Sequence, residues 1–428
     1  MSPPTERFFP PVTAAGLETQ LPALRAKLEK SRTLLLEPGP NGIYTASASQ
    51  TSDSASGYQN AWLRDNVLVA FSRWETGRRD SALETLRGLE KFLESQASKM
   101  EAIIAKPARK ENIQRRPHVR FNARTLGELP ESWAHAQNDA LADVVWLRFL
   151  MANENRDKAS FDLTSDELDL FRLFPLYFKA IEYWKDRDSG AWEEARKVNS
   201  SSVGTVVAAL TEIERYLHDR KQTKGFNLRT LEKLIALGRR TLNEQLPFES
   251  PPIRRIDSAL LLLVYPLRVL QEKEAAQMIV SLVRARLEGP YGIRRYVGDS
   301  YFCQDYDQWF PPEMRSADFS SRSDVRDEFL QPGREAQWCL FDSLLSAIYS
   351  YDLLQDSAAP FERQLYHFNR AIGQITPEGQ CPELYYLRHG NYFTNDNTPL
   401  AWAQANLAIA LHRLEQAGPE AARRASQR

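Results

Sequence analysis

Apolar residues recur every three or four positions along most of this chain, which is the spacing that places them on one face of an α-helix. The first such run carries Leu17, Leu21, Leu24 and Leu28 and extends to about residue 36. Comparable runs predict helices at about residues 62–75, 80–106, 136–153, 164–185, 203–219, 228–246, 256–270, 273–288, 334–354, 360–372 and 400–415. The pattern therefore predicts about twelve helices, with one strand-like segment near residues 118–121.

The segments between these helices are marked by turn-forming and polar residues. Residues 38–60 are rich in Gly, Ser and Thr and predict a loop. The aromatic and polar residues 289–333 lack periodicity and predict an unusually long irregular region. Thr164 and Glu167 fit a capping box at the start of one helix.

No linker-like stretch interrupts the chain between Leu17 and Gln416, so we predict one domain at residues 17–416. A proline-rich irregular segment at residues 1–16 is expected to precede this domain, and a frayed polar tail at residues 417–428 to follow it. Paired helices with long connections on one side predict an all-α ring of helices, with a site at the loop end. An irregular helical solenoid is the alternative, and the helix count does not separate the two.

Composition narrows the choice of partners. The 55 Lys and Arg residues nearly balance the 56 Asp and Glu residues, which gives no electrostatic case for a nucleic-acid partner. The longest apolar stretch, residues 259–267, is too short to cross a membrane, and no secretion signal follows the first residues. Three widely spaced cysteines fit neither a zinc site nor a disulfide framework. We therefore predict a cytoplasmic protein that binds neither nucleic acid nor membrane, and leave its oligomeric state open.

Two adjacent carboxylates stand out as candidate chemistry. Glu193 and Glu194 follow Trp192 in a glycine-containing turn, and a polar Asn-Ser-Ser-Ser run at 199–202 leads into the next helix. A turn can direct a carboxylate at a pocket while the helix behind it holds the position. The alternative is a solvated pair near a helix start, with Ser201 or Ser202 as the N-cap.

Other polar segments fall in connections or at helix starts. Arg64 and Asp65 suit a hydroxylated ligand, because guanidinium and carboxylate groups serve opposite ends of hydroxyl hydrogen bonds. A surface ion pair is the alternative for these two residues. The remaining segments are 133–139, 292–301, 381–386 and 398–402.

Taken in order, these segments resemble glycoside hydrolase family 15, the glucoamylases, and the glucoamylase-like domain of the phosphorylase kinase α and β subunits. Trp-x-Arg-Asp at 62–65 is similar to the family's first sugar-contact segment, and Trp-Glu-Glu at 192–194 to its catalytic-acid segment. Residues 295–301 resemble its Arg-Tyr-x-x-Asp-x-Tyr segment, and Pro-Glu-Leu-Tyr at 382–385 resembles the catalytic-base segment of the kinase subunits. The resemblance covers roughly residues 55–415.

The resemblance implies an all-α fold, the (α/α)6 barrel or six-hairpin toroid, with Glu193 as general acid and Glu383 as general base. It also implies a set of residues that bind the sugar or support its pocket, namely Tyr58, Trp62, Arg64, Asp65, Trp133, Gln137, Asp139, Trp192, Glu194, Arg295 and Trp402. Ordinary core packing is the alternative for the aromatic members. Trp192 is expected to exclude water and raise the pKa of Glu193, whereas Glu383 needs polar neighbours to stay ionised.

The implied function is that of an inverting exo-acting glycoside hydrolase, which releases glucose from the non-reducing end of an α-glucan or α-gluco-oligosaccharide. Two carboxyl groups and water suffice for this reaction, so no metal and no cofactor are predicted. The alternative is a catalytically weak glucan-binding or regulatory module, because residues 121–139, 200–208 and 382–386 look closer to the kinase subunits. A ring enzyme acting on another glycan is a third possibility. Linkage preference, chain length and the role of residues 300–333 stay open.

Overall fold

Long helices make up most of the computed structural model, which describes residues 7–47, 57–221, 225–322, 324–355 and 361–425. The helices are α1 (Leu17–Lys30), α2 (Leu63–Glu75), α3 (Arg79–Ala105), α4 (Asn138–Glu154), α5 (Ser165–Phe171), α6 (Leu173–Ile181), α7 (Ser200–Arg220), α8 (Leu228–Gln245), α9 (Leu261–Val264), α10 (Lys273–Leu287), α11 (Tyr306–Trp309), α12 (Pro312–Arg315), α13 (Asp324–Asp327), α14 (Phe341–Gln355), α15 (Phe361–Gly373) and α16 (Ala401–Ala425).

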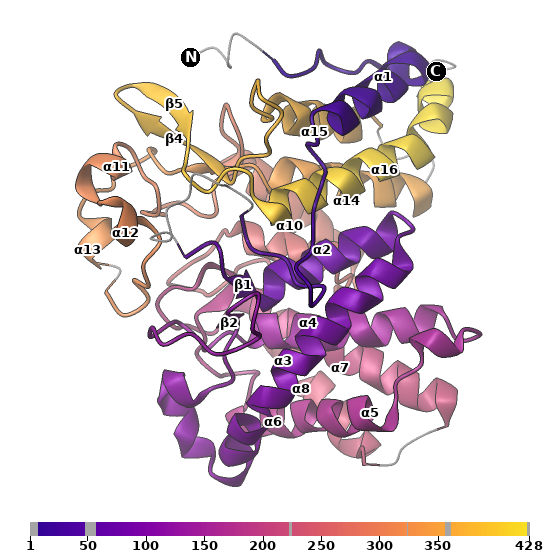
Figure 1. Cartoon of the computed structure of the whole chain (residues 1–428), viewed down its shortest axis with the longest axis vertical. Coiled ribbons are helices and arrows are strands. Elements are labelled where there is room, and N and C mark those ends of the chain that lie inside the picture. The colour runs from indigo at the N-terminus through magenta and orange to yellow at the C-terminus, as the bar shows by residue number, and fades with distance from the viewer. Residues whose placement is uncertain (1–6, 48–56, 222–224, 323, 356–360, 426–428) are drawn as a thin grey trace.

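An inner ring is formed by α2, α4, α7, α9, α14 and α16, which pack one against the next until α16 meets α2 again. Outer helices cover this ring, with α3 against α2, α8 against α7 and α15 against α14 (Figure 1). The predicted (α/α)6 arrangement is therefore confirmed. The ring explains how the helices are buried: α4 is buried at every position from Asn138 to Phe149, because it meets helices on all sides.

The outer helices bury one stripe each. In α8 the buried residues fall three or four positions apart, at Leu231, Leu234, Ile235, Gly238 and Leu242. This spacing places them on a single helix face, which packs on α7. The predicted capping box is also present, because the Thr164 side chain accepts from the Glu167 backbone and the Glu167 side chain accepts from the Thr164 backbone.

Several helix predictions need correction. The first run ends at Lys30 instead of about residue 36, and residues 334–340, predicted as helix, contain a two-residue strand before α14 begins at Phe341. The run at 164–185 forms two helices, α5 and α6, with Arg172 between them. The run at 256–270 forms only a 3-10 turn (Ser258–Leu260) and the short α9, because Pro266 cannot continue the helix. At the other end, α16 continues to Ala425 instead of fraying at residue 417, because its last turns pack near α1 and leave Ala417 buried.

The strands are short and lie at the ends of helices. β1 (Ala61–Trp62) pairs antiparallel with β2 (Arg120–Phe121) just before α2 begins. β3 (Gln337–Trp338), β4 (Leu384–Arg388) and β5 (Asn391–Thr394) form a three-stranded antiparallel sheet, which the helix pattern does not predict. In Figure 1 this sheet lies beside α11 and α12 at one side of the ring.

None of the described helices combines the length and the hydrophobicity needed to cross a bilayer. The predicted cytoplasmic location stays a prediction.

Candidate active site

A cavity of about 780 Å³ lies where the inner helices begin. The residues that line it stand at, or shortly before, the first turns of α2, α4, α7, α14 and α16, or in the irregular region after α10. They are Ala46, Tyr58, Trp62, Arg64, Asp65, Trp133, Ala191, Trp192, Glu193, Arg295, Tyr301, Ser316, Ala317, Asp318, Phe319, Arg326, Trp338, Glu383, Leu400 and Trp402.

Glu193 reaches this cavity from a short turn that precedes α7. The 3-10 turn Gly190–Trp192 ends at Glu193, whose backbone lies in the left-handed region with φ 58° and ψ 41°. Trp133 Nε1 donates a hydrogen bond of 2.9 Å to Glu193 Oε2, and Arg64 Nη1 lies 4.0 Å from Oε1. Burial raises the pKa of Glu193 to about 7, against the opposing charge of Arg64. A large fraction of Glu193 carboxyl groups therefore carries a proton near neutral pH.

Glu383 enters the cavity from the residue before β4. Its carboxylate accepts hydrogen bonds from three side chains: Tyr58 Oη to Oε1 at 2.6 Å, Asn397 Nδ2 to Oε2 at 2.9 Å, and Asn395 Nδ2 to the same Oε2. Burial raises the pKa of Glu383, and these three donors oppose the rise because they favour the charged form. The sequence predicts polar neighbours for Glu383 but does not identify either asparagine.

Glu194 points away from its neighbour Glu193 into a cluster of arginines. Its carboxylate oxygens accept from Arg254 at 2.7 Å, Arg295 at 3.1 Å and Tyr296 Oη at 2.6 Å. Burial alone raises the pKa of Glu194, but the charges of these arginines and of Arg326 outweigh burial and hold it well below the ordinary value. Adjacent carboxyl groups thus occupy opposite electrostatic environments.

Arg64 is held by polar groups that stand behind the cavity wall. Its Nε donates to Asp139 Oδ2 at 2.9 Å, and its Nη2 donates to Gln137 Oε1 at 2.5 Å. Its neighbour Asp65 lines the cavity, and burial raises the pKa of Asp65 to about 6. On the other side, Arg295 is fixed by Asp299, whose Oδ2 accepts from Arg295 Nε at 2.7 Å.

Aromatic rings form much of the remaining wall. Trp62 contacts Tyr58 and Trp133, with ring centroids 5.5 and 6.0 Å apart. Trp192 stacks against Trp402 at 6.4 Å, and its Nε1 donates to Asp257 Oδ1 at 2.8 Å. Flat rings of this kind suit the apolar faces of a sugar.

The structure brings most of the predicted residues together around the cavity. Gln137, Asp139 and Glu194 are not among the lining residues, and each contacts an arginine that lines the cavity, Arg64 or Arg295. Residues that sequence reasoning does not single out also line the cavity or touch its carboxylates, namely Ser316, Ala317, Asp318, Phe319, Arg326, Trp338, Asn395 and Asn397.

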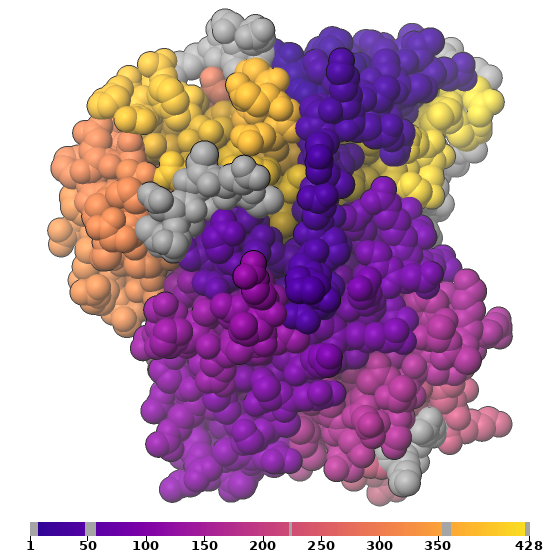
Figure 2. Space-filling model, in the orientation of Figure 1, coloured from indigo at the N-terminus to yellow at the C-terminus, as the bar shows by residue number. Residues whose placement is uncertain are grey.

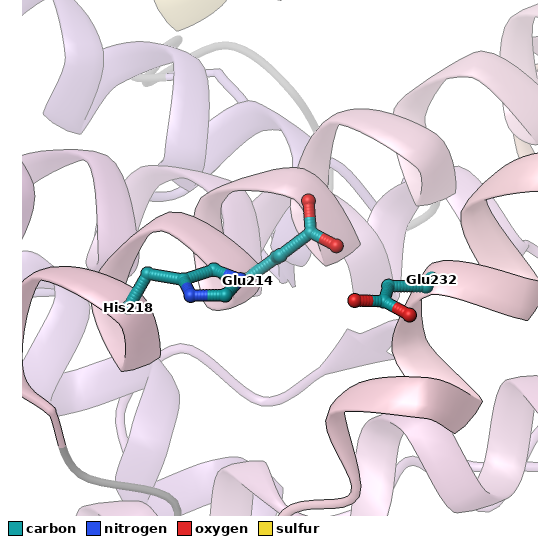
Figure 3. A group of neighbouring side chains, drawn as sticks. All are labelled: Glu214, His218 and Glu232. Atoms are coloured by element: carbon teal, nitrogen blue, oxygen red, sulfur yellow. The ribbon is translucent and has the colours of Figure 1, made fainter.

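A group that can hold a metal ion lies elsewhere among the described residues. Glu214 and His218 on α7 and Glu232 on α8 each offer a ligand atom, and these atoms lie within 4.8 Å of one another (Figure 3). Two of the three side chains are exposed, and none lines the cavity. The cavity chemistry described above makes no use of this group.

A ring of paired helices around a cavity lined by Glu193 and Glu383 is the arrangement of a glycosidase-type fold. The chain belongs to the glycosyl hydrolases family 15, whose family model matches residues 27–407. Among solved structures, it is similar to a protein described as "Glycosidase Wild Type", with a TM-score of 0.66, 18% identity and coverage of 94% of this chain and 98% of that chain. It is also similar to a glucoamylase from Saccharomycopsis fibuligera, with a TM-score of 0.60, 14% identity and coverage of 97% and 98% of the two chains.

The chain is also similar to a second group of proteins, the regulatory subunits of a kinase. The chain is 24% identical to the phosphorylase b kinase regulatory subunit alpha, liver isoform, of Oryctolagus cuniculus, over 89% of this chain and 32% of that protein. It is 25% identical to the probable regulatory subunit alpha of Caenorhabditis elegans, over 82% of this chain and 30% of that protein. The chain thus spans about a third of the length of these curated relatives.

Proposed function

We propose that the protein is an inverting exo-acting glycoside hydrolase that releases glucose from the non-reducing end of an α-glucan or an α-gluco-oligosaccharide. One observation carries this proposal: Glu193 and Glu383 line the same cavity in different environments, one kept protonated and the other surrounded by hydrogen-bond donors. Inverting hydrolysis requires one protonated and one ionised carboxyl group.

Glu193 is the proposed general acid. Its raised pKa leaves a proton available near pH 7, and that proton passes to the glycosidic oxygen as the bond from C1 to this oxygen breaks. Trp133 fixes the direction of the carboxyl group through its hydrogen bond. Arg64 lies close enough to stabilise the carboxylate that remains after the proton has left.

Glu383 is the proposed general base. It accepts a proton from a water molecule whose oxygen forms the new bond to C1 on the opposite face of the sugar, which inverts the anomeric configuration. The three donors around Glu383 keep its carboxylate in one orientation. A separation of about 6.5–9.5 Å between the two carboxyl groups stays a prediction of this proposal.

The sugar is proposed to be held by Arg64, Asp65 and Arg295, which present charged hydrogen-bonding groups to the cavity. Tyr58, Trp62, Trp133, Trp192 and Trp402 would supply the apolar faces. Gln137, Asp139 and Glu194 act in this proposal through the arginines that they hold. The proposed reaction uses no metal and no cofactor.

The test is glucose release by the wild type and by Glu193→Gln and Glu383→Gln, on maltose, maltooligosaccharides, isomaltose and trehalose. We expect each amide variant to lose about 10²- to 10⁴-fold in kcat. Glu131→Gln is the matched control, because Glu131 is exposed on the loop that carries Trp133. The first product should be β-glucose, which proton NMR detects before mutarotation. A near-full rate in either amide variant would overturn the assigned roles.

A catalytically weak glucan-binding or regulatory module is the second candidate function. The similarity to kinase regulatory subunits favours it, since these proteins match over most of this chain. A wild type that binds maltooligosaccharides in calorimetry but releases no glucose from any substrate of the panel would select this second function.

A further inference from the structure

A second cavity, of about 1030 Å³, lies at the opposite end of α2 from the first. It is enclosed by α1, by the segment that follows α1, by the last turn of α2 and by α16. Figure 2 shows the segment that follows α1, in indigo, running down the surface beside the yellow helix α16. Arg64 lines the first cavity and Arg73 lines the second. The two residues are nine positions apart on α2, which corresponds to about 13.5 Å along the helix axis.

Arg73 is a buried cation without a matching anion. Its side chain is almost enclosed, with the residue 8% exposed, and its Nη2 donates to Leu36 O at 2.7 Å. Its Nε is buried and has no hydrogen-bond partner. Within the described part of the chain no carboxylate forms an ion pair with Arg73. Since a buried charge is costly unless an opposite charge faces it, the position favours an anionic ligand.

Most of the charges around the cavity have the same sign as Arg73. Arg78 stands at the rim and forms no ion pair with any described carboxylate. Arg25 and Arg32 also line the cavity, but each is paired with a carboxylate that lies outside it, Glu415 and Glu37. Among the lining residues described, Glu29 supplies the one carboxylate. The lining therefore carries a net positive charge.

Most of the remaining wall is aliphatic, and Ser72, Thr76 and His412 are its other polar members. The aliphatic part consists of leucines and an alanine, namely Leu28, Leu34, Leu35, Leu36, Ala408 and Leu411. No Trp, Tyr or Phe lines this cavity, in contrast to the first one. The cavity therefore lacks the Trp, Tyr and Phe faces on which a sugar stacks, whereas an alkyl chain can pack against its leucines.

We propose that this cavity binds an organic anion with an unbranched apolar body, of the medium-chain carboxylate type. The carboxylate faces the guanidinium groups of Arg73 and Arg78, and the alkyl chain lies against the leucines of α1, of the following segment and of α16. This site is independent of the proposed hydrolytic function, since it lies at the other end of α2 and shares no residue with the first cavity.

The test uses sodium decanoate as the probe, by isothermal titration calorimetry and by thermal unfolding of the full chain. Decanoate should bind and raise the unfolding temperature, because a ligand that binds the folded state stabilises it. Sodium acetate carries the charge without the chain, and 1-decanol carries the chain without the charge, so both should have much smaller effects. Glucose and maltose should not displace decanoate.

Arg73→Met removes the cation and keeps the length of the side chain. We expect it to weaken decanoate binding about ten- to hundredfold, which is the usual loss for charge-assisted hydrogen bonds. Arg87→Met is the matched control, because Arg87 lies exposed on α3 outside both cavities. Equal binding by Arg73→Met, or no binding by the wild type, would overturn the proposal.

A second variant keeps the test open if Arg73→Met fails to fold. Ala408→Phe narrows the cavity from a half-buried position of α16 and leaves every arginine in place. It should also weaken decanoate binding. If Ala408→Phe binds decanoate as tightly as the wild type does, the ligand lies elsewhere and the proposal is wrong.

Discussion

Two neighbouring glutamates differ in the charge that surrounds them. Glu194 faces three guanidinium groups and stays ionised, whereas Glu193 is half-buried, with a tryptophan N–H donor and one arginine at 4.0 Å. The left-handed backbone of Glu193 separates the directions of the two side chains. A single turn can therefore present an acid to the cavity while its next residue anchors the arginines of the wall.

The pH dependence of activity should report the two cavity carboxyl groups separately. Glu193 must be protonated, and its pKa is raised to about 7, so kcat/KM should fall about tenfold per pH unit above that value. Glu383 must be ionised, so activity should also fall as pH drops through its pKa, which burial places above the ordinary glutamate value. A profile with both limbs between pH 4 and 8 is expected, measured on the best substrate.

Two conservative variants show which of the two carboxyl groups produces each limb of this pH profile. Tyr58→Phe removes a donor to Glu383 and should move the acid limb to higher pH, by up to about one unit, while the alkaline limb stays in place. Trp133→Phe removes the donor to Glu193 and should move only the alkaline limb upward. If either variant shifts both limbs together, the two carboxyl groups do not hold the separate roles proposed for them.

The resemblance of several segments, in their order along the chain, to those of family 15 points to Glu193 and Glu383 as the two carboxyl groups of the reaction. Asn395, Asn397, Trp338 and Arg326 carry no such signal. They reach the cavity because strands and irregular segments fold back onto the ring of helices. The local sequence does not predict where these segments pack. The sequence also does not predict the direction of the Glu194 side chain, because this direction depends on arginines that lie 60 to 132 positions further along the chain.

At the scale of elements, the periodic pattern locates the long helices well and fails where a proline or a strand intervenes. Pro266 ends α9 after Val264, although leucines continue the apolar run. The hairpin of β4 and β5 does carry a strand signal, since tyrosines and leucines flank the turn at His389 and Gly390. Its short strands lie outside the helical spacing on which the prediction was based.

The close packing of α8 on α7 leads to a testable prediction for Gly238. A methyl group at Gly238 would lie 2.2 Å from Tyr183 Oη and 2.5 Å from Val207 Cγ2 on α7. We expect Gly238→Ala to lower the free energy of unfolding by about 1–2 kcal/mol, since overpacking exceeds the gain of about 1 kcal/mol in helix propensity. Urea unfolding measures this change.

Gly373→Ala is the control for that substitution, because Gly373 ends α15 with no atom within 4 Å of an added methyl group. It should be neutral or slightly stabilising. A Gly238→Ala protein as stable as the wild type would mean that α7 and α8 move apart at little cost.

At the scale of the whole molecule, the ring closes through contacts between its first and last inner helices, α2 and α16. The Arg413 side chain on α16 also pairs with Glu75 at the end of α2. Every inner helix therefore depends on two neighbours, and the cavity wall draws residues from both ends of the ring. The (α/α)6 architecture follows from the alternation of helices buried all round with helices buried on one side.

Removal of α16 should therefore abolish folding of the whole chain rather than of one part. A protein ending at Leu400 is expected to lack a cooperative unfolding transition, because it exposes the buried faces of α2 and α14. A protein ending at Gly418 keeps the buried residues of α16 up to Ala417 and should unfold cooperatively. Circular dichroism during heating distinguishes the two, and a cooperative transition in the shorter protein would contradict ring closure as the basis of stability.

The meeting of α2 with α16 also has a consequence for biosynthesis. Helix α2 leaves the ribosome long before α16 is made, and at about 5–20 residues per second the interval is roughly 15–70 s. During that interval the nascent α2 has no closing neighbour, and its apolar residues are open to misassembly with other chains. We expect heterologous production of this protein to benefit from slower translation or from added chaperones.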